Sequence, residues 1–130
     1  MHYAILCYND ERMVEGWSKE EDDAVIAHRK TVQKKLAVEG KLGPVVRLMP
    51  TTAATTLRAG RETLVLDGPF AETKEQLLGF YIVDCATLEE AIEAARALKG
   101  EETVGAFEIR PLRVLLPGGP LPSLPPSLSV

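Results

Sequence analysis

Alternating and helically spaced apolar residues predict a strand followed by a long helix in the first forty positions. Residues 2–8 are bulky and apolar on both faces, which is typical of a buried strand. Ser18 and Glu21 have the spacing of a capping box that begins a helix, and Gly40 follows the last residue of the apolar pattern. One stripe of that helix carries Val25, His28, Val32 and Leu36.

The rest of the pattern predicts more strands and a second helix. Thr87 and Glu90 form another capping box, and Gly100 lies just past the end of the helix that they begin. A hairpin is predicted around Ala59-Gly60-Arg61, and residues 77–85 are apolar on both faces, which predicts a central strand. The predicted strands of this part cover residues 42–48, 55–58, 62–67, 77–85 and 104–112.

This order of elements predicts an α+β fold, a ferredoxin-like sandwich with an antiparallel sheet and two helices. Two helices cover only one face of such a sheet. Because the central strands are apolar on both faces, we expect a partner subunit to cover the other face, which predicts a homodimer.

Composition and charge narrow the classes of function. Fifteen Lys and Arg against nineteen Asp and Glu give a net charge of −4, so direct nucleic-acid binding is not expected. The chain has no apolar run of the roughly 20 residues that span a bilayer and begins without a basic leader, so we expect a cytoplasmic protein without membrane contact. Residues 117–130, PGGPLPSLPPSLSV, are uncharged and rich in Pro, which predicts a flexible tail after a folded domain of residues 1–116.

Two positions are candidates for catalysis, and each has a structural interpretation as well. His28 is the one ionisable group on the helix stripe and is either a packed histidine or a general acid/base. Asp67 begins the turn Asp67-Gly68-Pro69-Phe70. Its carboxylate either caps the N–H groups of that turn, with Phe70 anchored in the core, or also faces a pocket.

Ligand-binding candidates are Arg47, Phe70 and Tyr81. The guanidinium of Arg47 suits an anionic substrate, whereas Arg58 and Arg61 flank the hairpin and are expected to be solvated. Cys7 and Cys85 lie in apolar strands and are predicted to be small buried residues rather than nucleophiles. No histidine or acidic cluster has metal-ligand spacing, so neither a metal nor a cofactor is predicted.

The stretch at residues 64–86, LVLDGPFAETKEQLLGFYIVDCA, resembles the DGPF branch of the YCII-related proteins, and the opening HYAILCYND and closing FEIRPL resemble that family's first and last strands. The resemblance implies a ferredoxin-like fold that dimerises into an α+β barrel, with a pocket between sheet and helices or at the dimer interface. It also implies a first-helix histidine, which His28 matches, and an aspartate as active-site residues. One branch of the family acts on lactones.

Two hypotheses about function follow. In the first, the protein binds a small molecule, with His28 as acid/base and Asp67 orienting it. The substrate is lactone-like or a small anion, and Arg47 or a tyrosine would hold an anionic one. In the second, it is a non-catalytic regulatory module associated with an extracytoplasmic-function sigma factor, as the genomic setting of the family implies. The Pro-rich tail could then dock on a partner.

Overall fold

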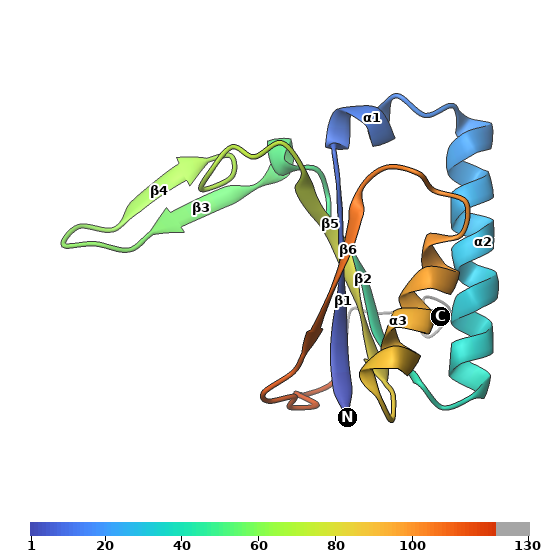
Figure 1. Cartoon of the computed structure of the whole chain (residues 1–130). Helices are drawn as coiled ribbons and strands as arrows, with labels where there is room; N and C mark the ends of the chain where they lie inside the picture. Colours follow the sequence, from blue (N-terminus) through green and yellow to red (C-terminus); the bar gives the residue numbers. More distant parts are fainter. Residues whose placement is uncertain (122–130) are drawn as a thin grey trace.

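A computed structural model describes residues 1–121 of the chain. It contains a four-stranded antiparallel sheet in the order β2-β5-β1-β6, with the two longer helices on one face (Figure 1). The α+β, ferredoxin-like architecture that the sequence predicts is thereby confirmed. The sheet strands are β1 (His2–Asn9), β2 (Leu42–Arg47), β5 (Gln76–Asp84) and β6 (Ala106–Pro111).

The described residues form three α-helices rather than the two that the sequence predicts. The covering helices are α2 (Lys19–Val38) and α3 (Leu88–Lys99), as expected, and the additional helix is the short α1 (Glu11–Glu15). Because α1 has only five residues, it is too short to show a periodic apolar pattern. The three-residue 3-10 helix η1 (Thr51–Ala53) was not predicted from the apolar pattern either.

Helix ends lie where the polar residues predict them. The Ser18 hydroxyl accepts the N–H of Glu21 at 3.1 Å, and the Thr87 hydroxyl accepts the N–H of Glu90 at 3.2 Å. After α3, Gly100 has a φ of +58°, a left-handed conformation that favours glycine. These caps fix where both helices begin and where α3 ends.

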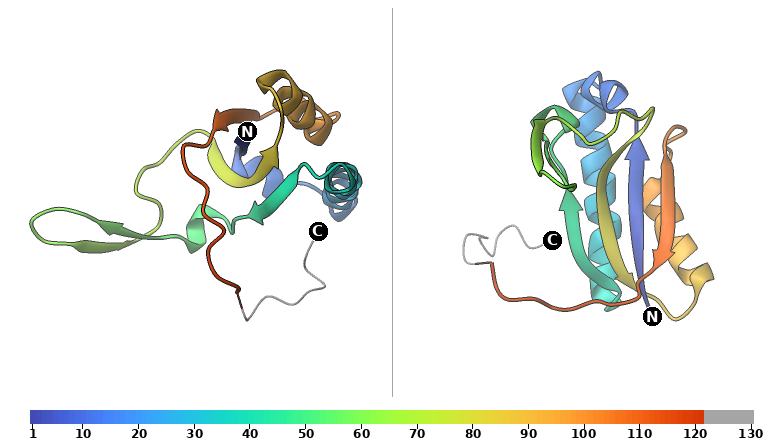
Figure 2. Two further views of the ribbon diagram at one scale, coloured as in Figure 1. Left: turned by 90° about the horizontal axis from the view of Figure 1, so that it is seen from below. Right: turned by 90° about the vertical axis from the view of Figure 1, so that its left-hand side faces the viewer.

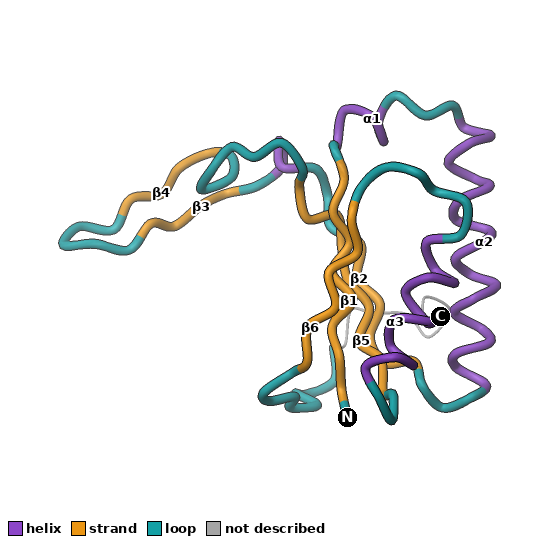
Figure 3. The backbone as a smooth tube through the Cα atoms, viewed as in Figure 1, coloured by secondary structure: helices purple, strands orange, loops and turns teal. Residues whose placement is uncertain are grey.

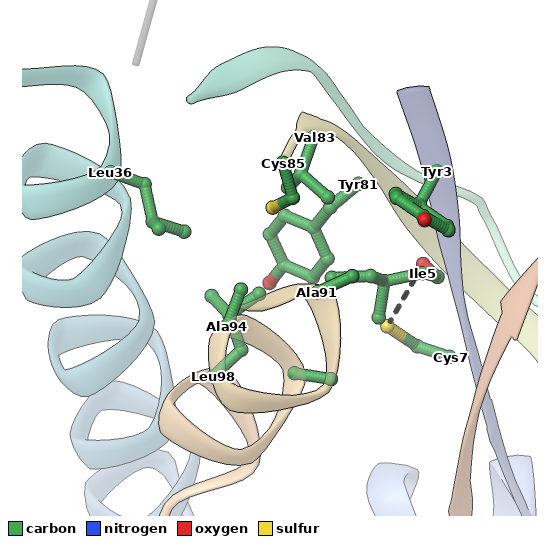
Figure 4. Packing of buried hydrophobic residues seen from close by; sticks show 11 residues of the cluster. Tyr3, Ile5, Cys7, Leu36, Tyr81, Val83, Cys85, Ala91, Ala94 and Leu98 are labelled. Atoms are coloured by element: carbon green, nitrogen blue, oxygen red, sulfur yellow. Dashed lines mark hydrogen bonds between the residues drawn. The ribbon is translucent and has the colours of Figure 1, made fainter. Parts of the chain in front are cut away.

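The core lies between the sheet and the two helices. Ile5, Val83 and Leu98 are fully buried, and each such side chain contributes roughly 1.5–3 kcal/mol when it leaves water. Figure 4 shows the ring of Tyr81 projecting from β5 into this cluster, with Cys7 and Cys85 beside it. The expectation that both cysteines are small buried residues is confirmed.

The opposite face of the sheet, which we call the open face, has no described helix on it (Figure 2). Because side chains alternate along a strand, the neighbours of the core residues point to this face. The register pairs Phe80 with both Leu6 and Val46, and Ala4 with Ile82, so the apolar residues of the open face lie together on β2, β5 and β1. On β6 the face carries the ion pair of Glu108 and Arg110 instead.

A hairpin between β2 and β5 extends away from the sheet on the side of the open face (Figures 1 and 3). Its strands β3 (Thr55–Arg58) and β4 (Leu64–Asp67) pair only with each other. The hairpin lies where it was predicted, although β4 begins at Leu64 and not at residue 62. We call β3, β4 and the turn between them the arm. None of the helices in residues 1–121 is long and apolar enough to cross a membrane.

Candidate functional site

A cavity of about 180 Å³ lies between α2 and the sheet, near the end of β1. That volume resembles an engineered cavity of roughly 150 Å³ that accepts benzene. Its walls are mostly apolar, and they include the single tryptophan of the chain. The main apolar residues are Val14, Trp17, Val25, Ile26, Val45 and Phe107.

A buried ion pair forms the polar centre of the cavity. Arg29 of α2 donates from Nη2 to both carboxylate oxygens of Glu102, at 2.8 and 2.9 Å. Only 22% of the Arg29 side chain and 14% of the Glu102 side chain remain exposed. The guanidinium also lies 5.4 Å from the centroid of the Phe107 ring, which adds a cation–π contact.

The Nε of Arg29 is buried and has no hydrogen-bond partner among the described residues. A buried donor without a partner is costly, and a guanidinium has five N–H donors of which the bonds to Glu102 use only those on Nη2. Arg29 therefore keeps hydrogen-bonding capacity at the wall of the cavity.

Burial also sets the protonation of two neighbouring groups. It raises the pKa of the Cys7 thiol from 9.0 to about 11, although the nearby charge of Arg29 acts in the opposite direction. Burial likewise raises the pKa of the Tyr81 hydroxyl, against the charge of Arg29 and hydrogen bonding by Gln33. Cys7 is therefore a neutral thiol at pH 7, not a nucleophilic thiolate, and Tyr81 is a neutral phenol that can donate a hydrogen bond.

The mouth of the cavity is marked by a second ion pair. Arg47 Nη2 lies 3.5 Å from Asp22 Oδ1, with 63% and 37% of the two side chains exposed. Both residues line the cavity and also an outer groove of about 560 Å³, which begins at this point. A ligand in the cavity could extend past Arg47 into the groove.

The groove is shaped by α1, the helix that the sequence analysis did not predict. Glu11 of α1 accepts the N–H and the hydroxyl of Thr51 at 2.6 and 2.7 Å, and its own N–H donates to Gln76 at 2.9 Å. These three bonds hold α1 against η1 and the start of β5. Glu11 itself lines the groove, so these bonds tie one of its walls to the segment that follows Pro50.

Two of the predicted ligand-binding residues, Arg47 and Tyr81, line the cavity together. His28 does not line it. Its Nε2 lies 2.8 Å from the carbonyl oxygen of Ala97, and its ring packs against Gly100 at the end of α3. Successive residues of a helix point about 100° apart, so when Arg29 points into the cavity its neighbour His28 points to the flank. His28 is exposed, so within the single chain it is not a buried core histidine, and its ring lies on the end of α3 instead.

Asp67 and Phe70 lie away from the cavity, on the arm and on the loop that follows it. The predicted core anchor is wrong within the chain, because the Phe70 side chain is 74% exposed. The physical reason is that β4 pairs with β3 alone and never joins the sheet, so the residues after it do not reach the core. The turn is closed by the Gly68 N–H on Ala54 and by the Thr56 hydroxyl on the Gly68 carbonyl, both at 2.7 Å, and no hydrogen bond to the Asp67 carboxylate occurs among the described residues.

Sequence reasoning missed Arg29 and Glu102, which form the polar centre. They lie 73 positions apart, and Glu102 looks like an ordinary loop charge. A signal was present for Arg29, because Asp22, Val25, Ile26, Arg29 and Gln33 recur at helical spacing of three and four and all line the cavity.

Comparison with known proteins agrees with this architecture. The YCII-related domain matches residues 1–115, which include every residue of the sheet and helices. The chain belongs to the YCII-related family. An uncharacterised protein of Rhizobium meliloti (strain 1021) is 58% identical over 120 residues, which cover 91% of this chain and 97% of that protein. The cavity, the arm and the open face of this YCII-related protein all lie within the matched residues.

Proposed function

We propose that this YCII-related protein binds a small molecule with a ring-sized apolar body and one acidic group, in the cavity between α2 and the sheet. The observation that carries the proposal is Arg29, a partly buried guanidinium at an apolar wall with an unpartnered Nε. An apolar pocket with a few convergent polar groups is the usual form of a small-molecule site.

Charge at the cavity supports an anion. Its lining carries three cationic side chains, Arg29, Lys30 and Arg47, against the two carboxylates of Asp22 and Glu102. Since Glu102 pairs with Arg29 and Asp22 with Arg47, Lys30 adds one further positive charge. A guanidinium can donate two parallel hydrogen bonds to one carboxylate, and the neutral hydroxyl of Tyr81, which also lines the cavity, is a further donor.

The test uses Trp17, whose ring lines the cavity and is the only indole of the chain. A panel of single-ring carboxylates is titrated against the protein, each beside its neutral amide, while Trp emission and thermal unfolding are recorded. A ligand present at about 100 times its Kd stabilises the native state by roughly 2.7 kcal/mol. We expect one or more carboxylates to bind at least tenfold more tightly than their amides.

Substitutions in the cavity test whether the preference for a carboxylate over its amide arises there. Arg29→Met combined with Glu102→Gln removes both charges, so neither is left unpaired in the interior, and it should abolish the preference for the acid. The control is Arg96→Gln on α3, whose guanidinium is 69% exposed and lies outside the cavity. If no carboxylate in the panel binds better than its amide, or if the double variant keeps the preference, the proposal fails.

Acid–base work by His28 with Asp67 on a lactone stays a prediction from the family resemblance. The two residues lie on α2 and at the end of β4, apart from the cavity. Lactone hydrolysis by the wild type that is lost in His28→Ala would support this prediction, and equal rates would exclude it. We also propose that the chain falls in the DGPF branch of the family, on the string Asp67-Gly68-Pro69-Phe70. The regulatory alternative, association with a sigma factor, has no structural observation in its favour.

A further inference from the structure

The outer groove is larger than the cavity into which it opens. Small-molecule sites usually enclose about 300–1,000 Å³. The cavity, at about 180 Å³, is smaller than such a site, whereas the groove, at about 560 Å³, lies within that range. A ring-sized body in the cavity therefore fills only the inner part of a longer site.

An apolar wall runs without a break from the cavity into the groove. Val14, Trp17 and Leu78 line both. Backbone hydrogen bonds hold this wall, because the N–H of Trp17 donates to the Val14 carbonyl at 3.1 Å and the N–H of Leu48 donates to the Leu78 carbonyl at 2.8 Å. A ligand that extends out of the cavity therefore meets the same apolar surface along its whole length.

Beyond the mouth of the cavity, the groove continues along the segment that follows β2. Leu48, Met49 and Pro50 line it there, and the first two side chains are 44% and 77% exposed. Exposed apolar side chains that lie together mark a surface that a partner or ligand covers. The flexible, polarisable side chain of methionine adapts to ligands of different shape.

The charged residues of the groove do not provide a second polar anchor. Glu11 accepts two hydrogen bonds from η1, and Asp22 is paired with Arg47. Glu15 and Lys19 carry opposite charges and are exposed to water, where each keeps its hydration. The part of a ligand that lies in the groove is therefore best matched when it is apolar.

We propose that the ligand is a ring carboxylate with an unbranched apolar substituent opposite the acid, and that the groove binds this substituent. The inference rests on the proposed function, in which Arg29 binds the acid. Arg29 lies deeper than Arg47, since their side chains are 22% and 63% exposed. A substituent opposite the acid then points out through the mouth toward Met49, whereas one next to the acid points at the cavity wall.

The experiment compares benzoate, 4-butylbenzoate and 2-butylbenzoate by titration of Trp17 emission, because this ring lines both cavity and groove. A fully buried methylene lowers Kd by about fourfold, and one that keeps half its contact with water by about twofold. We therefore expect 4-butylbenzoate to bind at least tenfold more tightly than benzoate. The 2-butyl isomer has the same apolar area and should bind no better than benzoate, which separates the groove from non-specific adsorption.

A pair of methionine substitutions assigns the gain to the groove. In Met49→Ser, the ratio of the Kd of benzoate to that of 4-butylbenzoate should fall by about threefold, because the chain loses one apolar contact. The control is Met13→Ser on the neighbouring α1, whose side chain is 48% exposed and lines neither the cavity nor the groove. It should keep the wild-type ratio. Thermal unfolding of both variants checks that the fold is retained.

The failure of this inference differs from the failure of the proposed function. Benzoate that binds more tightly than benzamide, but no more weakly than 4-butylbenzoate, would overturn the inference and leave the proposed function standing. Equal affinity of the 4-butyl and 2-butyl isomers, or an unchanged ratio in Met49→Ser, would also overturn it. If benzoate and its butyl derivatives bind no better than the matching amides, both the proposed function and the carboxylate class fail.

Discussion

Both carboxylate oxygens of Glu102 lie within 2.9 Å of Nη2 of Arg29, and this pair joins α2 to the loop that leads into β6. The two residues are largely removed from solvent, so their attraction is little screened by water. The pair therefore organises the cavity and connects the helix layer to an edge of the sheet.

The first prediction concerns the stability of this pair. Glu102→Gln leaves the Arg29 charge without its counter-ion in a mostly buried position, and breaking such a pair costs about 3 kcal/mol. Urea unfolding at pH 7 measures the loss. Glu93→Gln, which breaks the exposed pair with Arg96, should change the free energy of unfolding by less than about 0.5 kcal/mol. Equal effects of the two substitutions would contradict a structural role for Glu102.

The second prediction is a loss of stability in alkali. Burial raises the pKa of Cys7 from 9.0 to about 11, so in this range the unfolded chain loses its thiol proton before the folded chain does. The raised pKa of Cys7 therefore adds its full contribution to the free energy of unfolding below pH 9. This contribution is lost as the pH rises to about 11, at up to roughly 1.4 kcal/mol per pH unit. Tyr81 shifts in the same direction, with the same sign.

The urea midpoint measured between pH 8 and pH 11 checks this sign in the wild type and in Cys7→Ala. The variant should lose stability less steeply with pH, although it starts lower because a buried side chain has been shortened. A slope that is unchanged in Cys7→Ala would show that the thiol does not titrate as its burial requires.

The third prediction couples His28 to Gly100. A Cβ at Gly100 would lie 2.6 Å from His28 Nε2, and its φ of +58° is unfavourable for other residues. Gly100→Ala should therefore destabilise the fold by about 1–2 kcal/mol, through backbone strain and through the clash. His28→Ala should cost about 1 kcal/mol, for the bond to the Ala97 carbonyl.

A double-mutant cycle separates the two causes. In His28→Ala combined with Gly100→Ala the clash is absent and only the backbone strain remains, so the combined loss should be smaller than the sum of the single losses. Strict additivity would show that the histidine ring does not rest on the end of α3.

The fourth prediction concerns the mouth of the cavity. Asp22 competes with an acidic ligand for Arg47, from which it is 3.5 Å away. Asp22→Asn should strengthen binding of a carboxylate several-fold, and Arg47→Gln should weaken it by a similar factor, because both groups are partly exposed and solvent screens them. Titration of the neutral amide with both variants is the control, and its affinity should not move.

Local sequence signals predicted much of this fold because they act between neighbours in the chain. The caps at Ser18 and Thr87, the period-two strands and the hairpin around Gly60 each depend on residues a few positions apart. Whether the hairpin joins the main sheet depends on long-range pairing, and for this reason the exposure of Phe70 was not predictable.

The candidate site was only half predictable for the same reason. Arg47 and Tyr81 were chosen for their chemistry, and the fold places both at the cavity. His28 and Arg29 are adjacent on α2. The apolar pattern assigned the inward-facing side of the helix to His28, whereas Arg29 is the residue that lines the cavity. The decisive partner, Glu102, is brought to Arg29 only by the packing of the loop after α3.

The position of the arm in the chain has a consequence for the diversification of such proteins. It is inserted between β2 and β5, two strands that pair directly with each other, so the sheet is complete without it. Residues 55–67 can therefore be lengthened, shortened or exchanged while the register of the sheet and the lining of the cavity stay as they are. The arm and the lining of the cavity therefore belong to separate segments of the chain, and one segment can change while the other is retained.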